Sequence, residues 1–310
     1  MSKEFDVAVI GAGIAGLTAG LTSARLGRST IVLTGDVLGG HLLSIEKVEG
    51  YPGFPEGVPG FDLCPMAEEQ AGEAGAEFDP VEVSAIEAAD SKWKITTAGE
   101  EVLAGAVVIA TGTALKELNV PGEERLRGRG VSHCATCDAP LLRDQVAAIA
   151  GGGDSAAQEG LTLAEFASKV YLFNDAPDLT AQASYRDLVS ANPKIEIRNN
   201  TVIEEVLGED GVTGVRIKDS STNATEDVEL TGVFVYVGLQ PNTAFLDGLL
   251  TLDPTGRIPV DGEMRTTLPG VFAAGTVRTG TAGRAAAAAG DGAAAAIAAD
   301  AYLTSGSWRD

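Results

Sequence analysis

The sequence predicts an α/β protein with two Rossmann-like nucleotide-binding domains of the three-layer ββα kind. Three observations support this prediction. A first glycine turn, residues 11–16 (Gly-Ala-Gly-Ile-Ala-Gly), stands between an apolar run and an alanine- and leucine-rich stretch. A second glycine turn, residues 151–156 (Gly-Gly-Gly-Asp-Ser-Ala), has the same context about 140 residues later. The 310 residues, 45% of them hydrophobic, are enough for two domains with separate cores.

The first forty residues have the order of a βαβ unit. Residues 5–10 predict a strand, the stretch to Leu26 predicts a helix ended by Gly27, and residues 30–33 predict a second strand. In such a unit the glycines permit a tight turn and the close approach of a pyrophosphate to the helix N-terminus. The turn therefore predicts a dinucleotide site.

The next segments alternate between loop and strand patterns. Proline and glycine in residues 51–61 predict an ordered loop, and residues 81–109 predict short strands that lead into Ala110-Thr111-Gly112. Near the C-terminus, residues 270–275 predict a strand, and the alanine-rich residues 285–299 predict a closely packed helix.

A second βαβ unit begins inside the chain. Residues 146–150 predict a strand, a helix follows the second glycine turn and runs through Ala167, and residues 169–173 predict the next strand. Two glycine turns in the correct context indicate two nucleotide-binding domains. One nucleotide in each domain is typical of a two-cofactor oxidoreductase.

The charge balance excludes several classes of partner. With 22 basic and 44 acidic side chains, the formal net charge is −22. Nucleic-acid binding depends on cationic contacts with phosphates, so it is not expected, and anionic membranes would repel the chain. No apolar run approaches the roughly 20 residues of a membrane span. The N-terminal residues do not have the pattern of a signal peptide, so we expect a cytoplasmic protein.

The three cysteines fall into a pair and a single residue. Cys134 and Cys137 form a CxxC motif, for which no second pair exists to complete a four-ligand zinc site, so we expect no metal. Two cysteines at this spacing can close a reversible disulfide, and Asp138 can exchange the proton that thiol chemistry needs. Cys64 is expected to pack in a core.

With these motifs in place, the chain resembles the low-molecular-weight thioredoxin reductases over almost its full length. The run from 128 to 138 (Gly-Arg-Gly-Val-Ser-His-Cys-Ala-Thr-Cys-Asp) between two nucleotide folds is the most specific match. The other matching segments, in family order, are residues 11–16, 39–42, 51–54, 110–112, 151–156, 237–243 and 270–275.

The resemblance implies a homodimeric flavoprotein that reduces thioredoxin or a thioredoxin-like protein. Residues 1–114 and 245–310 would form the FAD-binding domain, and residues 117–242 the inserted NAD(P)-binding-like domain with the disulfide. Cys137 would face the flavin, Cys134 would attack the partner's disulfide, Asp138 would be the acid and base, and the domains would rotate between two arrangements. The residues that would contact FAD are Gly11, Gly13, Ala15, Gly16, Gly40, His41, Thr111, Gly112, Gly275, Thr276, Arg284 and Ala285.

The expected donor site departs from the family pattern. The family places a His-Arg-Arg cluster and a further arginine after the strand at 169–173, to bind the 2′-phosphate of NADPH. This chain has no arginine there and has Asp175 and Asp178. A carboxylate at this position accepts from a ribose 2′-hydroxyl and repels a phosphate, which argues against NADPH. Either NADH is the donor, or electrons come from ferredoxin, reduced deazaflavin or another carrier. The candidate nucleotide contacts are Gly151, Gly153, Asp154, Ser155, Ala156 and Asp175.

The flavin side departs as well. Where the family has a Gly-Asp step, this chain has Gly275-Thr276, and where the family has an Arg-Gln pair, this chain has Gly283-Arg284. The glutamine that follows Gly-Gly in the family is His41 in this chain, and a family asparagine is Gly50. The Thr276 hydroxyl can still form a hydrogen bond, so we expect FAD to be retained with altered contacts at the isoalloxazine. Changes near both cofactors indicate an altered electron source.

Three hypotheses follow for the function. The favoured one is an FAD-dependent disulfide reductase with a donor other than NADPH. The second is a dithiol oxidase that passes electrons through flavin to oxygen, although Ala135-Thr136 between the cysteines favours the reductase. The third is a non-catalytic flavin-binding redox sensor, against which Cys134, Cys137 and Asp138 argue.

Overall fold

The computed structural model describes residues 3–308, which divide into two compact units. The first unit comprises the chain to Ala114 and from Gln240 onward, and the second comprises residues 115–239. The prediction of two Rossmann-like domains, the second inserted into the first, is confirmed. Asn242 belongs to the first unit, where its side-chain amide donates to the carbonyl oxygen of Thr111 at 2.9 Å.

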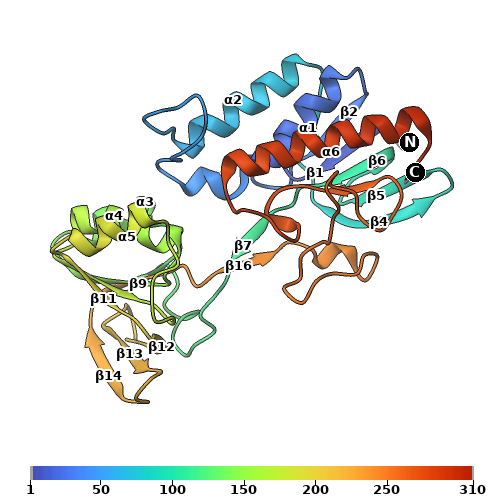
Figure 1. Ribbon diagram of the computed structural model, residues 1–310. Helices are drawn as coiled ribbons and strands as arrows, with labels where there is room; N and C mark the ends of the chain where they lie inside the picture. Colours follow the sequence, from blue (N-terminus) through green and yellow to red (C-terminus); the bar gives the residue numbers. More distant parts are fainter. Residues whose placement is uncertain (1–2, 309–310) are drawn as a thin grey trace. The chain divides into compact units, whose positions relative to one another are not determined.

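The first unit is one sheet with helices packed on it (Figure 1). Its elements are β1 (Lys3–Ile10), α1 (Ile14–Arg25), β2 (Thr30–Leu33), η1 (Gly40–Ser44), α2 (Gly60–Glu73), β3 (Glu77–Asp79), β4 (Val83–Ala89), β5 (Lys92–Thr97), β6 (Glu101–Ile109), β7 (Thr113–Leu115), η3 (Ala244–Leu246), β17 (Val271–Ala273), η4 (Gly275–Val277) and α6 (Ala285–Ser305).

The sheet of the first unit branches at β6. Its strand order is β3-β2-β1-β6-β5-β4, and β17 also pairs with β6. β5 runs antiparallel beside residues 101–104 of β6, whereas β17 runs parallel beside residues 107–109. Alternate residues of β1 face opposite sides: Val7 and Val9 pack in the cluster with α1, α2 and α6, and Ala8 and Ile10 pack in the cluster with β5. Three layers result.

The second unit repeats this design, again with three α-helices. Its elements are β8 (Val131–Ser132), α3 (Ala135–Asp138), η2 (Ala139–Leu142), β9 (Val146–Ala150), α4 (Asp154–Phe166), β10 (Lys169–Phe173), α5 (Ala183–Ala191), β11 (Ile195–Arg198), β12 (Thr201–Leu207), β13 (Gly214–Asp219), β14 (Thr225–Glu229) and β15 (Gly232–Val235). β16 (Leu239–Pro241) pairs with β7 where the chain passes between the units.

The sheet of the second unit is parallel, with the order β11-β10-β9-β15-β8. Ile149 of β9 packs with α3, α4 and α5 on one face. Ala148 and Ala150 of the same strand pack on the other face against the antiparallel sheet β12-β13-β14 (Figure 1). The predicted ββα fold includes such a second β layer, but the sequence analysis did not locate its strands, which are short and partly exposed.

The structure confirms the predicted bounds of three strands. β2, β9 and β10 begin and end at the predicted residues, since each is a short apolar run buried on both faces. The C-terminal helix is longer than predicted and continues to Ser305, where Gly306 with φ 71° ends it. Among residues 3–308, no helix is long and apolar enough to cross a membrane.

Candidate active site

The two cysteines of the second unit are joined by a disulfide at the start of a one-turn helix. The Cα atoms of Cys134 and Cys137 are 5.3 Å apart. Cys134 precedes α3, and its sulfur accepts a hydrogen bond from the Cys137 amide at 3.2 Å. Cys137 is exposed and Cys134 is half-buried, so an external disulfide can reach this pair. We call residues 134–138 the redox turn.

Asp138 closes the redox turn. Its amide donates to the carbonyl oxygen of Cys134 at 3.2 Å, and its side chain is half-buried. The structure therefore brings the three residues predicted to be catalytic onto one turn. Behind them, the Tyr236 hydroxyl accepts a hydrogen bond from the Ala135 amide at 3.2 Å. Sequence reasoning missed Tyr236 and its neighbour Glu159, because neither belongs to a motif.

The second glycine turn connects β9 to α4. Gly151 has φ 134°, and α4 begins at Asp154. A cavity of about 380 Å³ adjoins the turn, and Asp175 is the one charged residue that lines it. The lining residues are Leu118, Ala150, Gly151, Gly152, Gly153, Phe173, Asn174, Asp175, Ala176, Thr180, Thr201, Val202, Ile203, Tyr236, Val237 and Gly238.

The segment after β10, residues 174–182, is fixed against the second glycine turn. The amides of Thr180 and Ala181 donate to the carbonyl oxygen of Gly152 at 2.9 and 3.1 Å. Asp154 accepts from the backbone amide of Gln182 at 2.7 Å and from its side-chain amide at 3.0 Å. The carboxylate of Asp154, a predicted nucleotide contact, thus holds this segment in place.

The residues at the end of β10 have different roles. Asn174 is 1% exposed, and its side-chain amide donates to the Ala176 carbonyl and to Asn199, both at 2.9 Å. Asp175 is exposed, and within residues 3–308 its carboxylate has no hydrogen bond or ion pair, so it can accept from a ligand. Ala156 is fully buried in the helix–sheet core, whereas Ser155 is half-buried.

The first glycine turn connects β1 to α1. Gly11 has φ 102°, and a Cβ atom added to Gly13 would meet no heavy atom within 4 Å. Beside it lies a cavity of about 450 Å³ that is also lined by Thr34, Thr111 and Asn242. An open glycine surface at a helix N-terminus next to such a cavity fits the pyrophosphate and adenosine of FAD.

Two further segments lie against the first glycine turn. The Gly39 amide donates to the Ala12 carbonyl at 2.8 Å, and a Cβ on Gly40 would lie 3.6 Å from the Gly13 Cα. This places His41, the next residue of η1, on the same side of the unit. The surrounding chain removes part of the hydration of His41 and lowers its pKa below 6.5, although the residue remains exposed to solvent.

The remaining predicted FAD contacts come from both parts of the first unit. The hydroxyl oxygens of Thr276 and Thr113 are 3.2 Å apart, and a Cβ on Gly112 would lie 3.5 Å from the Thr276 hydroxyl. Arg284 is exposed and precedes α6, which begins at Ala285. Thr276 therefore uses its hydroxyl, but toward a protein side chain.

A carboxylate that sequence reasoning missed reaches the same region from α6. Asp291 accepts a hydrogen bond from the Gly275 amide at 3.1 Å. It also forms an ion pair with Arg278, with its two oxygens 2.7 and 2.8 Å from the guanidinium nitrogens Nε and Nη2. The two side chains are 9% and 15% exposed, so the pair is largely desolvated. An acidic residue therefore lies beside Gly275 although residue 276 is threonine.

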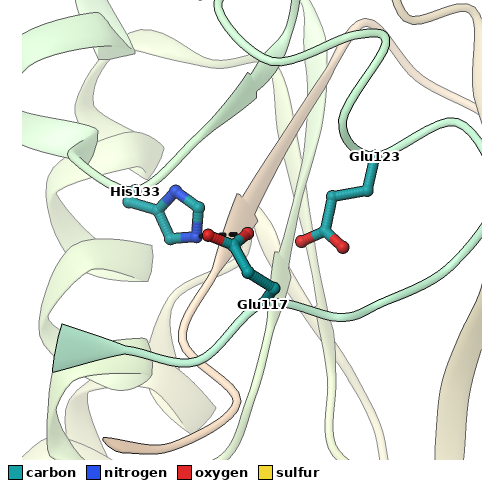
Figure 2. Close-up of side chains that lie close together, drawn as sticks. All are labelled: Glu117, Glu123 and His133. Carbon is teal, nitrogen blue, oxygen red and sulfur yellow. Dashed lines mark ion pairs between the residues drawn. The ribbon is translucent and has the colours of Figure 1, made fainter. Parts of the chain in front are cut away.

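The second unit also holds a cluster of Glu117, Glu123 and His133, whose ligand-type atoms all lie within 4.8 Å of one another (Figure 2). Arg127 approaches Glu117 to 2.9 Å and lowers the pKa of that carboxyl. Glu123 accepts from the amides of residues 118–119, and His133 Nε2 lies 3.4 Å from Glu117. Arg127 and His133 pair with Glu117 and the two amides bind Glu123, although Glu117 Oε2 and His133 Nε2 form no hydrogen bond within residues 3–308.

The comparisons with known proteins agree with this architecture. The model of the pyridine nucleotide-disulphide oxidoreductase family matches residues 5–292. Thioredoxin reductase of Treponema pallidum is 37% identical over 303 residues, 98% of each chain. The crystal structure of Lactococcus lactis thioredoxin reductase has a TM-score of 0.94 at 35% identity, covering 97% of this chain and 99% of that chain.

A ferredoxin-flavin thioredoxin reductase from Clostridium acetobutylicum is also similar, with a TM-score of 0.54 at 30% identity, covering 98% of this chain and 99% of that chain. Family match, identity and coverage all point to a flavin-dependent disulfide oxidoreductase. The chain belongs to the pyridine nucleotide-disulphide oxidoreductase family and, within it, to the thioredoxin reductases.

Proposed function

We propose that this chain is a cytoplasmic, homodimeric disulfide reductase that takes electrons from a donor other than NADPH and reduces a thioredoxin-like protein. The first unit would bind FAD at the first glycine turn, and the second unit would carry the Cys134–Cys137 redox pair. The cavity at the second glycine turn is the observation that carries the proposal. Asp175 is the one charged residue that lines it, so a 2′-phosphate would meet a carboxylate and no cation.

The redox turn performs the thiol chemistry. When bound and reduced by the donor, FAD would supply the two electrons that open the Cys134–Cys137 disulfide, which leaves both cysteines as thiolates. The Cys134 thiolate then attacks one sulfur of the partner's disulfide, which forms a mixed disulfide and releases the partner's other sulfur as a thiolate. Asp138 gives that sulfur a proton. The Cys137 thiolate next attacks the sulfur of Cys134, re-forms the internal disulfide and releases the second partner thiolate.

Two classes of donor fit the cavity. In the first, NADH binds at the second glycine turn, and the free carboxylate of Asp175 accepts from its ribose 2′-hydroxyl. In the second, the cavity takes no nicotinamide, and a carrier such as ferredoxin or reduced deazaflavin delivers the electrons. The similarity to a ferredoxin-flavin thioredoxin reductase supports the second class.

The donor is identified by anaerobic flavin reduction. The purified, flavin-loaded chain is mixed in turn with NADH, NADPH, reduced ferredoxin and a reduced deazaflavin, and loss of flavin absorbance is followed. We expect rapid bleaching with one of these donors and slow bleaching with NADPH. Rapid bleaching by NADPH alone would contradict the proposal. Bleaching by none of them, with oxygen consumption on addition of a dithiol, would favour a dithiol oxidase.

The role of Cys134 is tested separately. Cys134→Ser should abolish reduction of oxidised thioredoxin while the true donor still reduces the flavin, because the serine hydroxyl cannot form the mixed disulfide. Cys64→Ser is the matched control, since Cys64 is buried in the first unit and has no part in the exchange. Turnover of oxidised thioredoxin by the Cys134 variant would show that the nucleophile is assigned wrongly.

A further inference from the structure

Tyr236 contacts both functional features of the second unit. It follows β15 directly and is 8% exposed. Its hydroxyl accepts a hydrogen bond from the Ala135 amide of the redox turn at 3.2 Å. The same residue lines the cavity beside the second glycine turn. One buried residue therefore joins the cavity to the redox turn within a single compact unit.

The backbone of Tyr236 is fixed against the second glycine turn. Its amide donates to the carbonyl oxygen of Ala150, the last residue of β9, at 2.8 Å. Its own carbonyl oxygen lies so close to Gly151 that a Cβ atom added to this glycine would overlap it. The side chain packs in the same apolar cluster as Ala135 and Ala139. A ligand that contacts Tyr236 in the cavity therefore acts on a residue that is held at both ends.

The redox turn needs side chains to cap its first amides. The first amides of a helix have no partner within the helix, and α3 is one turn long. The Ser132 hydroxyl accepts from the Cys134 amide at 3.1 Å, and Tyr236 accepts from the next amide, that of Ala135. The Cys137 amide donates to the Cys134 sulfur, which changes its bonding when the disulfide opens. The two hydroxyls take no part in the redox step, so they can hold the turn while the disulfide is open.

We propose that Tyr236 couples the cavity to the redox turn, so that a dinucleotide bound in the cavity stabilises the Cys134–Cys137 disulfide. The occupant is the dinucleotide of the first donor class, so the inference rests on that part of the proposed function. A ligand that restrains Tyr236 keeps the Ala135 amide in place and thereby keeps the two thiols of the open pair close together. By linkage, the oxidised chain binds the ligand more tightly than the reduced chain by the same factor.

The test follows the thiol–disulfide equilibrium of the full, flavin-loaded chain in anaerobic buffers of reduced and oxidised glutathione. Two glutathione thiols open the Cys134–Cys137 disulfide and become one glutathione disulfide, so the midpoint of the series gives the equilibrium constant. The probe is ADP-ribose, which has the adenosine and pyrophosphate of NADH and no nicotinamide that could exchange electrons with flavin. Alkylation and mass measurement count the thiols with and without saturating ADP-ribose.

Two variants separate the coupling from a general loosening of the turn. Tyr236→Phe removes the hydroxyl that binds the Ala135 amide and keeps the ring. Ser132→Ala is the matched control, because it removes the other capping hydroxyl of the turn and Ser132 does not line the cavity. Each variant loses one hydrogen bond to the redox turn, but Tyr236→Phe alone loses the connection to the cavity.

We expect ADP-ribose to shift the midpoint about fivefold toward the disulfide in the unaltered chain and in Ser132→Ala. In Tyr236→Phe the shift should fall below about twofold while ADP-ribose still binds, because the ligand no longer acts on the Ala135 amide. A shift that Tyr236→Phe retains in full would overturn the inference. So would bound ADP-ribose that leaves the unaltered chain unshifted, or a lack of ADP-ribose binding in calorimetry.

The affinity for ADP-ribose is a second measurement, and it needs no variant. Calorimetry compares the Kd for the oxidised chain with the Kd for the chain in excess reduced glutathione, and we expect about fivefold tighter binding to the oxidised chain. Equal Kd values would overturn the coupling, including the case in which Tyr236→Phe does not fold.

Failure of the proposed function is seen in a different reaction. The glutathione equilibrium involves neither thioredoxin nor an electron donor, so it still tests the coupling if the pre-reduced, unaltered chain does not reduce oxidised thioredoxin. Conversely, binding of ADP-ribose without a shift would overturn the coupling and leave NADH as a possible donor.

Discussion

The two glycine turns share a backbone design but differ in what surrounds them. Gly11 and Gly151 both follow a strand and have φ of 102° and 134°, which only glycine adopts readily. At the first turn, a Cβ on Gly13 would meet open space. At the second turn, residues 174–182 are hydrogen-bonded onto Gly152 and Asp154. The two turns therefore have the same backbone fold but differ in which part of their surface is accessible.

The cavities beside the turns have the same charge character. The cavity at the first turn is lined by one charged residue, Glu82, and that at the second turn by one, Asp175. Helix N-termini and backbone amides can bind a pyrophosphate without a cation, whereas an added 2′-phosphate calls for one. Neither cavity is lined by a cation that could bind a 2′-phosphate.

The largest effect is expected from Gly13→Ala. The added methyl meets no protein atom, so the fold should keep its stability, but it occupies the surface where the pyrophosphate of FAD would lie. We expect the variant to purify with less than about a tenth of the normal flavin content, since close backbone approach is lost. Flavin absorbance per chain and thermal unfolding of the flavin-free protein measure the two effects.

Gly153→Ala is the counterpart in the second turn, where the nearest atom to the added Cβ is the Thr180 hydroxyl at 3.9 Å. It should keep its flavin and lose reduction by NADH, if NADH is the donor. Normal flavin content in Gly13→Ala would show that FAD does not use the first turn as proposed.

The next effect concerns stability. Asp291→Ala leaves the guanidinium of Arg278 and the Gly275 amide without their buried partner, so we expect a loss of about 3 kcal/mol in the free energy of unfolding. Asp300→Ala removes a more exposed ion pair with Arg28 from the same helix and should cost about 0.5 kcal/mol. Denaturant unfolding measures both. Equal losses would mean that the Asp291 pair is no more than a surface pair.

These residues also mark how far the sequence could predict the site. The glycine turns and the CxxC motif are local patterns, so their positions were predictable, as were β2, β9 and β10. Asp291 stands in an alanine-rich helix with no signal of its own, and it meets Gly275 only because α6 packs on the sheet. Tyr236 is likewise brought to the redox turn by tertiary packing. Contacts of this kind follow from the fold and not from spacing along the chain.

A smaller effect is expected at the second cavity from Asp175→Arg. The substitution exchanges a carboxylate for a guanidinium at the end of β10 and should strengthen binding of NADPH relative to NADH by about tenfold, through a charge-assisted phosphate contact. Competition between the two nucleotides, followed by fluorescence titration, measures the ratio. Asp178→Arg adds the same charge to an exposed position that does not line the cavity, and it should change the ratio little. If the two variants changed the ratio equally, the added positive charge would attract the 2′-phosphate of NADPH from any nearby position, and Asp175 would not mark a specific phosphate site.

The smallest effect is expected for the reactivity of the third cysteine. Cys64 lies in the first unit, and its thiol can be compared with those of the cysteine pair in the second unit. Cys64 is fully buried in the first unit, and burial raises the pKa of its thiol to about 11, so very little thiolate exists at neutral pH. In the native reduced protein, alkylation at pH 7.5 should therefore modify Cys134 and Cys137 and leave Cys64 intact. Cys64→Ala should leave the number of modified thiols unchanged, whereas Cys137→Ser should lower it by one. Modification of Cys64 at a rate similar to that of the redox pair would mean that the core of the first unit opens near Gly39, whose carbonyl lies 3.5 Å from the Cys64 sulfur.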